Sequence, residues 1–233
     1  MDNLFLNLHT SIMEKKKYKQ YQAARESNPA FTLNQISKIA FNRAKAGERY
    51  QQLETITAQL MCALTMEAVL NYLGKQLFNN KEEIERCLDK KRLKKLRENN
   101  IEFNNWEEIE RILTPKEKLR MIAKYSNLEI NLSSSPFQDF SKIFGFRDNL
   151  VHAKSSYHFA TTVKQSDIDE NGLPMINKVS ELTTDWEKLC NVKTAEKWRN
   201  AVYSMSSTLS NAAKCQDPVI IDGAIDTWGE IEV

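Results

Sequence analysis

The chain has 233 residues, of which 41% are hydrophobic and 27% charged, and its formal net charge is +2. This length suffices for one well-buried domain, and so small a net charge beside 10 Phe, 7 Tyr and 4 Trp excludes a disordered protein. Only 6 Gly and 5 Pro leave too few turns for a many-stranded sandwich or barrel, so an all-α fold is expected.

Three parts are expected along the chain. Residues 1–31 are predicted to form an N-terminal helical extension and residues 32–214 a single helical domain. Residues 215–233 read as an acidic tail, because they hold five acids and no base. No internal repeat and no low-complexity block interrupts this order.

The location of the protein is inferred from its apolar stretches and its cysteines. The most apolar stretch, Ala58–Gly74, contains Glu67 and Asn71 and is shorter than the roughly 20 residues of a membrane span. At the N-terminus the basic run 15–17 follows the apolar residues, whereas a secretion signal would have its charge first. The 4 Cys are scattered without a Cys-x-x-Cys pair, which favours reduced thiols and no zinc site. A cytoplasmic protein without membrane contact, metal or cofactor is expected.

A long helical pattern is predicted to form the centre of the fold. It runs from Thr32, a plausible N-cap, to Phe78, with a possible break at Gly47. Its second half is apolar nearly all round, so neighbouring helices should cover it. One stripe of this half continues from apolar into polar side chains at helical spacing: Leu53, Ile56, Leu60, Leu64, Glu67 and Asn71.

Glu67 and Asn71 each allow two interpretations. A carboxylate on such a stripe requires a partner, so Glu67 is predicted either to pair with Arg147 or a nearby Lys, or to belong to an active groove. Asn71 either satisfies a neighbouring backbone or helix end, or lines the same groove.

The segment 89–97, Asp-Lys-Lys-Arg-Leu-Lys-Lys-Leu-Arg, is strongly basic. Most runs of this kind are solvated helix faces. The alternative is a patch that faces phosphate groups and binds nucleic acid without chemistry.

Two further helices are predicted before residue 152. Thr114 and Pro115 begin one, as cap and first residue, and it should end by Asn127. After the turn at 133–136, aromatic residues recur at helical spacing and lead to Arg147.

The region beyond lacks helical period over residues 155–181, where a long loop or a short hairpin of 157–163 with 175–179 is expected. The last helix is predicted to run from Thr184 to about Ala213.

The sequence contains no glycine-rich phosphate loop, no paired metal ligands and no hydrolase nucleophile motif. One group of residues remains as a candidate catalytic site. Arg147 and His152 stand five positions apart, which on an unbroken helix separates them by about 140°. They converge on one ligand only if the helix begins near Arg147, or if a second copy of the chain forms a groove with it. Asp148 lies one turn before His152 and is expected to orient the imidazole through a hydrogen bond.

The segment Arg147-Asp-Asn-Leu-Val-His152 resembles the signature of the higher-eukaryote and prokaryote nucleotide-binding (HEPN) domains: Arg, a polar residue, three more residues, then His. The resemblance includes the preceding helix around Glu117–Ile122 and the acidic and amide positions Glu67 and Asn71 in a central helix, and it spans roughly residues 55–213.

This resemblance implies an all-α, HEPN-like helical bundle that is commonly a homodimer, and many such proteins are metal-independent endoribonucleases acting as toxins or in phage defence. It implies that His152 is the general acid or base at the ribose 2′-hydroxyl or the leaving oxygen, and that Arg147 holds the phosphate. RNA is then the substrate, and an antitoxin or operon partner is possible. Other members of the family bind without cutting, so a non-catalytic dimerisation or nucleic-acid-binding module is the alternative.

One position departs from a subgroup of the family. Toxins controlled by nucleotidyltransferase partners carry a Tyr two residues after the motif His, where this chain has Lys154. Regulation by modification of that tyrosine is therefore not expected, although Tyr157 is close in sequence. Lys154 either touches phosphate or is solvated.

Overall fold

The computed structural model describes residues 20–25, 29–47, 50–151, 170–171, 185–220 and 226–231. The chain divides into two compact units, of which one is a helical body from Asn28 to Asp222 and the other contains two strands. Within the described part of the body every regular element is a helix, which confirms the all-α prediction there. The elements of the body are α1 (Pro29–Lys45), α2 (Gln51–Leu77), α3 (Lys81–Cys87), α4 (Lys90–Glu98), α5 (Trp106–Ile109), α6 (Pro115–Tyr125), the 3-10 helix η1 (Phe137–Asp139), α7 (Phe140–Val151), α9 (Asp185–Leu189) and α10 (Val192–Ala213).

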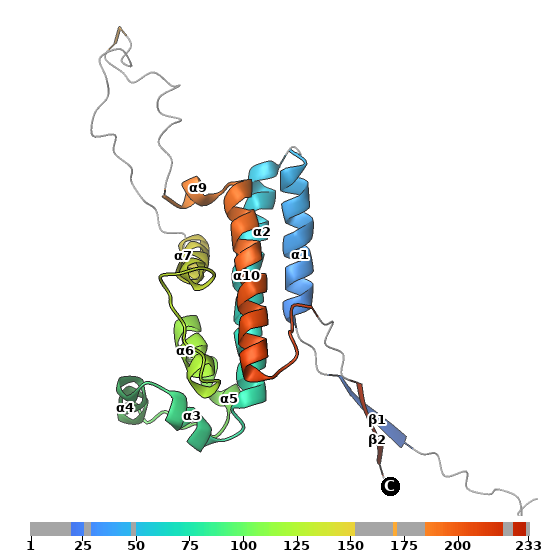
Figure 1. Ribbon diagram of the computed structural model, residues 1–233, viewed down its shortest axis with the longest axis vertical. Coiled ribbons are helices and arrows are strands. Elements are labelled where there is room, and N and C mark those ends of the chain that lie inside the picture. Colours follow the sequence, from blue (N-terminus) through green and yellow to red (C-terminus); the bar gives the residue numbers. More distant parts are fainter. Residues whose placement is uncertain are drawn as a thin grey trace, which may run out of the picture. The chain divides into compact units, whose positions relative to one another are not determined.

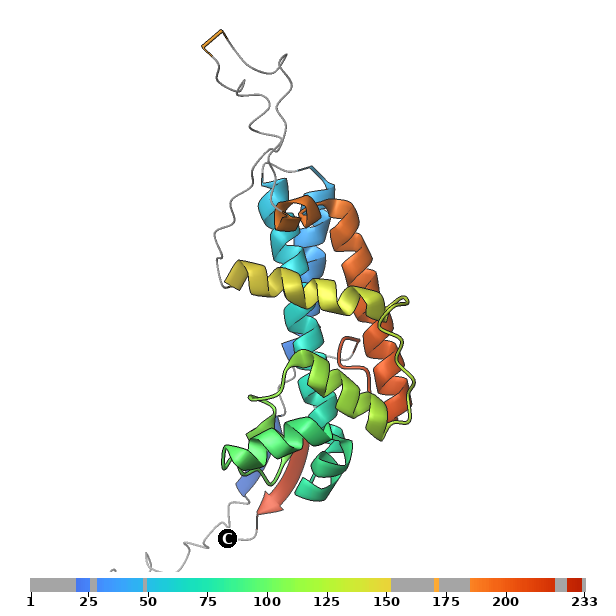
Figure 2. The same ribbon diagram turned by 90° about the vertical axis from the view of Figure 1, so that its left-hand side faces the viewer.

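Helix α2 lies at the centre of the body, as its apolar composition predicts. It packs against α1, α10, α6, α7 and α5. Figure 1 shows α1, α2 and α10 side by side as three long helices, with α6 and α7 on the other side of α2 from α1. In Figure 2, α7 crosses α2 at a steep angle. Because several helices cover α2, polar residues on it are placed between elements that are distant in sequence.

The predicted break at Gly47 is confirmed. Gly47 has a φ of +73°, in the left-handed region that favours glycine, and it ends α1 before α2 begins. The predicted N-cap at Thr32 is wrong, because α1 already begins at Pro29. A proline suits the first helical position, since its fixed φ is helical and its missing N–H has no partner to lose there.

The far end of α2 is built on a close approach between helices. Gly74 leaves room for the indole of Trp106 in α5, and this ring stacks on Phe78 at 5.2 Å between centroids. A β-carbon at position 74 would overlap the indole, so glycine is required by packing here. This contact attaches the segment α3–α5 to the central helix.

The predicted helix after Thr114 is confirmed as α6. The Thr114 hydroxyl accepts a hydrogen bond from the backbone N–H of Glu117 at 3.3 Å, while the Glu117 carboxylate accepts one from the backbone N–H of Thr114 at 2.7 Å. This reciprocal cap fixes the start of the helix. The predicted helix leading to Arg147 is confirmed as η1 and α7.

Helix α7 and the 3-10 helix η1 before it are each held against α10 by one contact. The ring of Phe146 meets that of Trp198 edge to face at 5.3 Å. The carboxylate of Asp139, in η1 and 1% exposed, accepts from the ammonium of Lys197 at 2.8 Å. These contacts fix the face of α7 that turns toward α2.

The prediction of a single last helix is wrong at one point. Helix α9 ends at Leu189, and α10 begins after Asn191, whose side chain accepts a hydrogen bond from the backbone N–H of Thr194 at 2.8 Å. An Asn N-cap competes with continuous helix because its amide oxygen satisfies a free N–H of the new helix. The end of α10 at Ala213 agrees with the prediction.

The second unit contains an antiparallel pair of strands, β1 (Gln20–Arg25) and β2 (Asp226–Ile231), in the register Gln20↔Ile231 to Arg25↔Asp226. The prediction of a helical extension over residues 1–31 is therefore wrong for 20–25, and the predicted tail contains a strand. The reason is that each strand is stabilised by main-chain hydrogen bonds to a segment about 200 residues away, which no local pattern reveals. The predicted hairpin of 157–163 with 175–179 lies outside the described residues.

Candidate polar site at Arg147

Arg147 is placed on the polar side of α7 by the aromatic residues around it. Phe144 and Phe146 are buried on the body side of the helix, and the Arg147 side chain is 21% exposed. Its guanidinium lies over the ring of Phe144, 5.1 Å from the centroid. A cation packed on an aromatic face keeps its charge while its stem covers apolar surface.

Two carboxylates hold this guanidinium. Nη1 of Arg147 donates to Oε2 of Glu67 at 2.5 Å, across the α7–α2 contact. Nε and Nη2 both donate to Oδ1 of Asp148, at 3.0 and 2.8 Å. The expected pairing of Glu67 with Arg147 is thus confirmed. Two N–H groups of the fork are not used in these bonds, because a guanidinium has five donors.

Asn71 and Lys118 lie beside this ion pair. Asn71 is one turn after Glu67 on α2, and its Oδ1 accepts a hydrogen bond from Nζ of Lys118 in α6 at 2.6 Å. The partner of Asn71 is therefore a lysine ammonium rather than the backbone or helix end that the sequence suggests. Lys118 is 3% exposed. Three helices, α2, α6 and α7, thus contribute one cluster of charged and amide side chains.

The electrostatics of Lys118 reflect this burial. Removal from water lowers the pKa of its ammonium, and the nearby Arg147 guanidinium lowers it further. The carboxylates of Glu67 and Glu110 act in the opposite direction and favour the charged form. Lys118 is thus the positive group that faces Glu67 from the α6 side, as Arg147 does from the α7 side.

The structure brings together some of the predicted site residues. Glu67, Arg147 and Asp148 form one ion-paired group, and Asn71 is adjacent through Lys118. His152, Lys154 and Tyr157 lie outside the described residues, which end in this region at Val151. The predicted hydrogen bond of Asp148 to His152 therefore stays a prediction, while the described part of the chain shows Asp148 bound to Arg147.

Lys118 is the residue that the sequence analysis missed. The sequence predicts no role for it, yet it lies three and four residues before Met121 and Ile122 on the buried side of α6. A lysine in phase with an apolar stripe requires a polar partner. Glu67 and Asn71, in phase with the apolar stripe of the central helix, were the matching signal.

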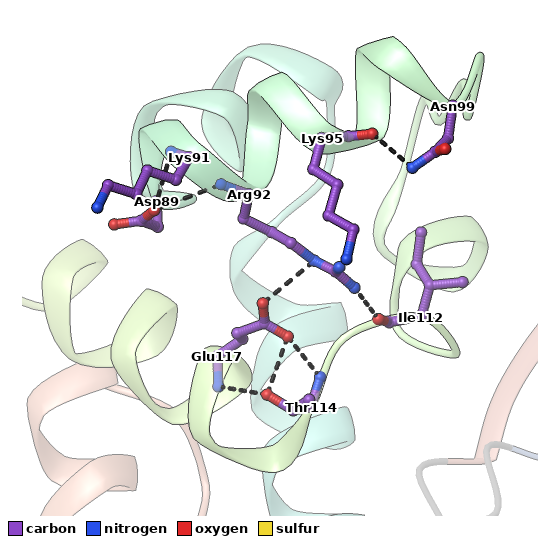
Figure 3. A network of polar contacts seen from close by, with 8 residues as sticks. All are labelled: Asp89, Lys91, Arg92, Lys95, Asn99, Ile112, Thr114 and Glu117. Carbon is purple, nitrogen blue, oxygen red and sulfur yellow. Dashed lines mark hydrogen bonds and ion pairs between the residues drawn. The ribbon is translucent and has the colours of Figure 1, made fainter.

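Figure 3 shows how the basic segment 89–97 is held in α4. Nε of Arg92 pairs with Glu117 Oε1 at 3.1 Å, and its Nη2 donates to the carbonyl of Ile112 at 2.5 Å. Two more cations of the segment are in ion pairs, Lys94 with Glu98 at 3.7 Å and Arg97 with Glu85 at 3.1 Å. Part of the segment is thus structural.

The remaining sequence predictions concern metals, thiols and membranes. Among the described residues no group of three or more His, Cys, Asp or Glu is placed to hold a metal ion. All four cysteines are free thiols in the structure, and burial raises the pKa of Cys62 to about 11. Within the part of the chain that the structure describes, only α2 is long and apolar enough to cross a membrane, and half of its most apolar window is buried in the body, as in a core helix.

Comparison with known proteins identifies no relative: no protein-family model, no curated protein and no solved structure matches this chain.

Proposed function

We propose that this protein is a metal-independent endoribonuclease of the HEPN type, acting in the cytoplasm as a toxin or phage-defence effector, together with an antitoxin or operon partner. The observation that carries the proposal is the ion pair between Glu67 and Arg147. It joins the arginine of the Arg-x4-His motif to the acidic position of the central helix, and both belong to the features on which the family resemblance rests.

The proposed chemistry is attack of the ribose 2′-hydroxyl on the adjacent phosphorus. His152 accepts the hydroxyl proton as the new oxygen–phosphorus bond forms. As the bond between phosphorus and the 5′-oxygen breaks, that oxygen takes up a proton from the imidazolium of a second copy or from water. The products are a 2′,3′-cyclic phosphate and a 5′-hydroxyl. Arg147 stabilises the negative charge on the phosphate oxygens with its two remaining N–H groups, while Glu67 and Asp148 fix the plane of the fork.

A homodimer is part of the proposal, and exposed apolar side chains support it. Ile39 in α1 is 53% exposed and Leu53 at the start of α2 is 60% exposed. The two helices are joined by the ion pair of Arg43 with Glu54 at 3.5 Å. By helical spacing, Ile39 lies one turn before Arg43 on α1, and Leu53 precedes Glu54 in sequence on α2. In the proposed homodimer, these two exposed apolar side chains are buried against the second copy.

The test is incubation of the purified protein with total RNA in the presence of EDTA. We expect cleavage to products that end in a cyclic phosphate, and we expect Arg147→Ala and His152→Ala to lose it by at least about 100-fold. Arg111→Ala and His158→Ala are matched controls, since they remove the same side chains outside the motif. Equal cleavage by the motif variants and the wild type would overturn the proposal, as would an absence of cleavage by the wild type.

A second candidate function is a non-catalytic helical module for dimerisation or nucleic-acid binding. The observation that favours it is that Nε, Nη1 and Nη2 of Arg147 all donate to carboxylates of the same chain, so the arginine already has a structural role. In this case Arg147→Ala lowers the melting temperature, and no RNA is cut by any variant.

A further inference from the structure

The surface between α6 and the start of α4 contains a groove that the proposed reaction does not use. The groove has a volume of about 430 Å³ and is formed by the turn between α3 and α4 on one side and by α6 on the other. Its charged lining residues are Asp89, Lys90, Lys91, Glu117, Arg120 and Lys124. Four cations and two carboxylates give this lining a net charge of +2.

Both carboxylates of the groove are occupied in holding the fold. Asp89 caps α4, accepting from the backbone N–H groups of Lys91 and Arg92 at 2.9 and 3.3 Å. Glu117 accepts from Thr114 and pairs with Arg92, as Figure 3 shows. Neither carboxylate forms an ion pair with a cation of the groove in the described structure.

The cations of the groove, by contrast, form no ion pair within the part of the chain that the structure describes. Lys90, Lys91 and Arg120 are exposed and form no ion pair with another described residue, and in Figure 3 the Lys91 side chain extends away from Arg92. Lys124 donates to the carbonyl of Arg86 at 2.6 Å, which positions the ammonium without cancelling its charge. The excess positive charge is therefore directed to solvent.

The placement of Lys90 and Lys91 has an energetic cost in the protein alone. They occupy the first two positions of α4, and the first turn of this helix has no acid. The N-terminus of a helix is its positive end, where cations are unfavourable by a few tenths of a kcal/mol each at low salt. The capping carboxylate of Asp89 offsets part of this repulsion, and a bound anion would offset more of it.

We propose that this groove binds the sugar–phosphate backbone of RNA at an auxiliary site, away from the phosphodiester that reacts. Arg120 and Lys124 are one helical turn apart, with β-carbons about 6 Å apart, and Lys90 and Lys91 face them from the other wall. A two-walled row of cations in an open groove suits a chain of phosphates better than a single small anion.

The groove and the reaction site lie on different sides of α6. Lys118, which reaches Asn71 beside Arg147, is two residues before Arg120 and six before Lys124. At 100° per residue, Arg120 lies about 160° and Lys124 about 120° from Lys118 around the axis of α6. The groove would thus hold a segment of RNA that flanks the cleaved bond, and in this respect the inference rests on the proposed function.

The test measures binding separately from cleavage. The perturbation is the triple variant Lys90→Gln, Lys91→Gln and Arg120→Gln, which replaces exposed side chains without described ion-pair partners. The matched control removes two lysines and one arginine that are also exposed but outside the groove: Lys38→Gln, Arg111→Gln and Lys193→Gln. Both sets of substitutions are made in the His152→Ala protein. Fluorescence anisotropy measures the affinity for a labelled single-stranded RNA, and for the DNA of the same sequence, over a range of KCl concentrations.

We expect the groove variant to bind both strands at least about tenfold more weakly than the control variant at low salt. Each lost phosphate contact reduces the slope of log K against log salt by about 0.7 for a single strand, so the slope should become less steep by about 2. RNA and DNA should lose affinity alike, because the groove reads phosphate. Circular dichroism melting of both variants verifies that each is folded.

Three results of the binding measurements would contradict the proposed groove. Equal affinities and slopes for the groove and control variants would overturn the inference, and so would wild-type protein that binds neither strand. Competition by polyglutamate as effective as competition by RNA would also overturn it, in favour of an acidic protein partner. If the groove variant loses binding while the wild type cuts no RNA, the groove stands and the nuclease proposal fails.

Discussion

Substitution of Gly74 by alanine tests the packing that attaches α5 to the central helix. A β-carbon at this position would lie 2.1 Å from two ring carbons of Trp106 and 2.7 Å from a third. Ordinary contacts of a β-carbon begin at about 3.4 Å, so the indole or the helix would have to move by about 1.3 Å. Trp106 is 1% exposed and stacked on Phe78, which leaves the ring little room to move.

The magnitude follows from two opposing effects. Alanine is about 1 kcal/mol more favourable than glycine inside a helix. Overpacking of a well-packed core costs about 1–3 kcal/mol and occasionally more, and an overlap of about 1.3 Å with a buried indole belongs at the upper end. We therefore expect Gly74→Ala to lower the free energy of unfolding by about 2 kcal/mol, which for a chain of this size lowers the melting temperature by about 4–8 °C.

Gly145→Ala is the matched control, because it makes the same change inside another helix. A β-carbon on Gly145 would meet nothing within 4 Å, and the position is exposed on α7. Only the helix propensity remains, so this variant should be more stable by about 0.5–1 kcal/mol. The two variants thus differ in the sign of their effect on melting temperature, measured by circular dichroism.

An unchanged or higher melting temperature of Gly74→Ala would show that the helix and the indole accommodate the β-carbon without cost. A variant too unstable to purify is examined in the Trp106→Leu background, which removes the overlapping ring. There Gly74→Ala should become neutral or stabilising, and an undiminished cost in that background would show that the indole is not its cause.

The cluster on α2, α6 and α7 and the exposed surface of α1 and α2 give the remaining predictions. Asn71→Leu should cost about 2–3 kcal/mol in urea unfolding because it leaves the buried Lys118 ammonium without its hydrogen bond, and adding Lys118→Met should recover most of this loss. Burial lowers the pKa of Lys118 in the folded state below 10.5, so the unfolded chain binds more protons than the folded one between the two pKa values. The free energy of unfolding of the wild type, compared with that of Lys118→Met, should therefore rise as the pH approaches 10.5. A difference that falls with pH would contradict the burial of the charge. The double variant Leu53→Glu and Ile39→Glu should convert the proposed homodimer into a monomer and reduce RNA cleavage. The control Ile220→Glu replaces another exposed apolar side chain, which is 64% exposed. It should change neither the molecular mass measured by light scattering nor the activity.

Parts of the fold whose signals are local could be predicted from the sequence. The break at Gly47 depends on the backbone freedom of one residue, and the start of α6 depends on a Thr cap, a Pro and a Glu within four positions. The central place of α2 follows from its apolar residues on every side. A residue acts on its near neighbours in these cases, so the sequence window contains the whole cause.

The candidate site could be predicted only in part. The stripe on α2 placed Glu67 and Asn71 on one face, and the need of a carboxylate for a cation indicated Arg147 or a nearby Lys as the partner of Glu67. The structure shows that it is Arg147. The burial of Lys118 against Asn71 was not predicted, because it depends on how α6 lies against α2. A side chain's burial is a property of the elements that cover it, and these are distant in sequence.

Signals in the sequence alone sufficed for the helical class of the body, the break at Gly47, the capped start of α6 and the motif residues. They did not reveal the break at the Asn191 cap. Folding in three dimensions determines the pairing of residues 20–25 with 226–231, the partner of Lys118 and the groove between α4 and α6. The difference lies in the range of the interactions. Helix propensity and capping act over a few residues, whereas strand pairing, ion pairs across helices and the shape of a groove require segments that meet only after the chain has folded.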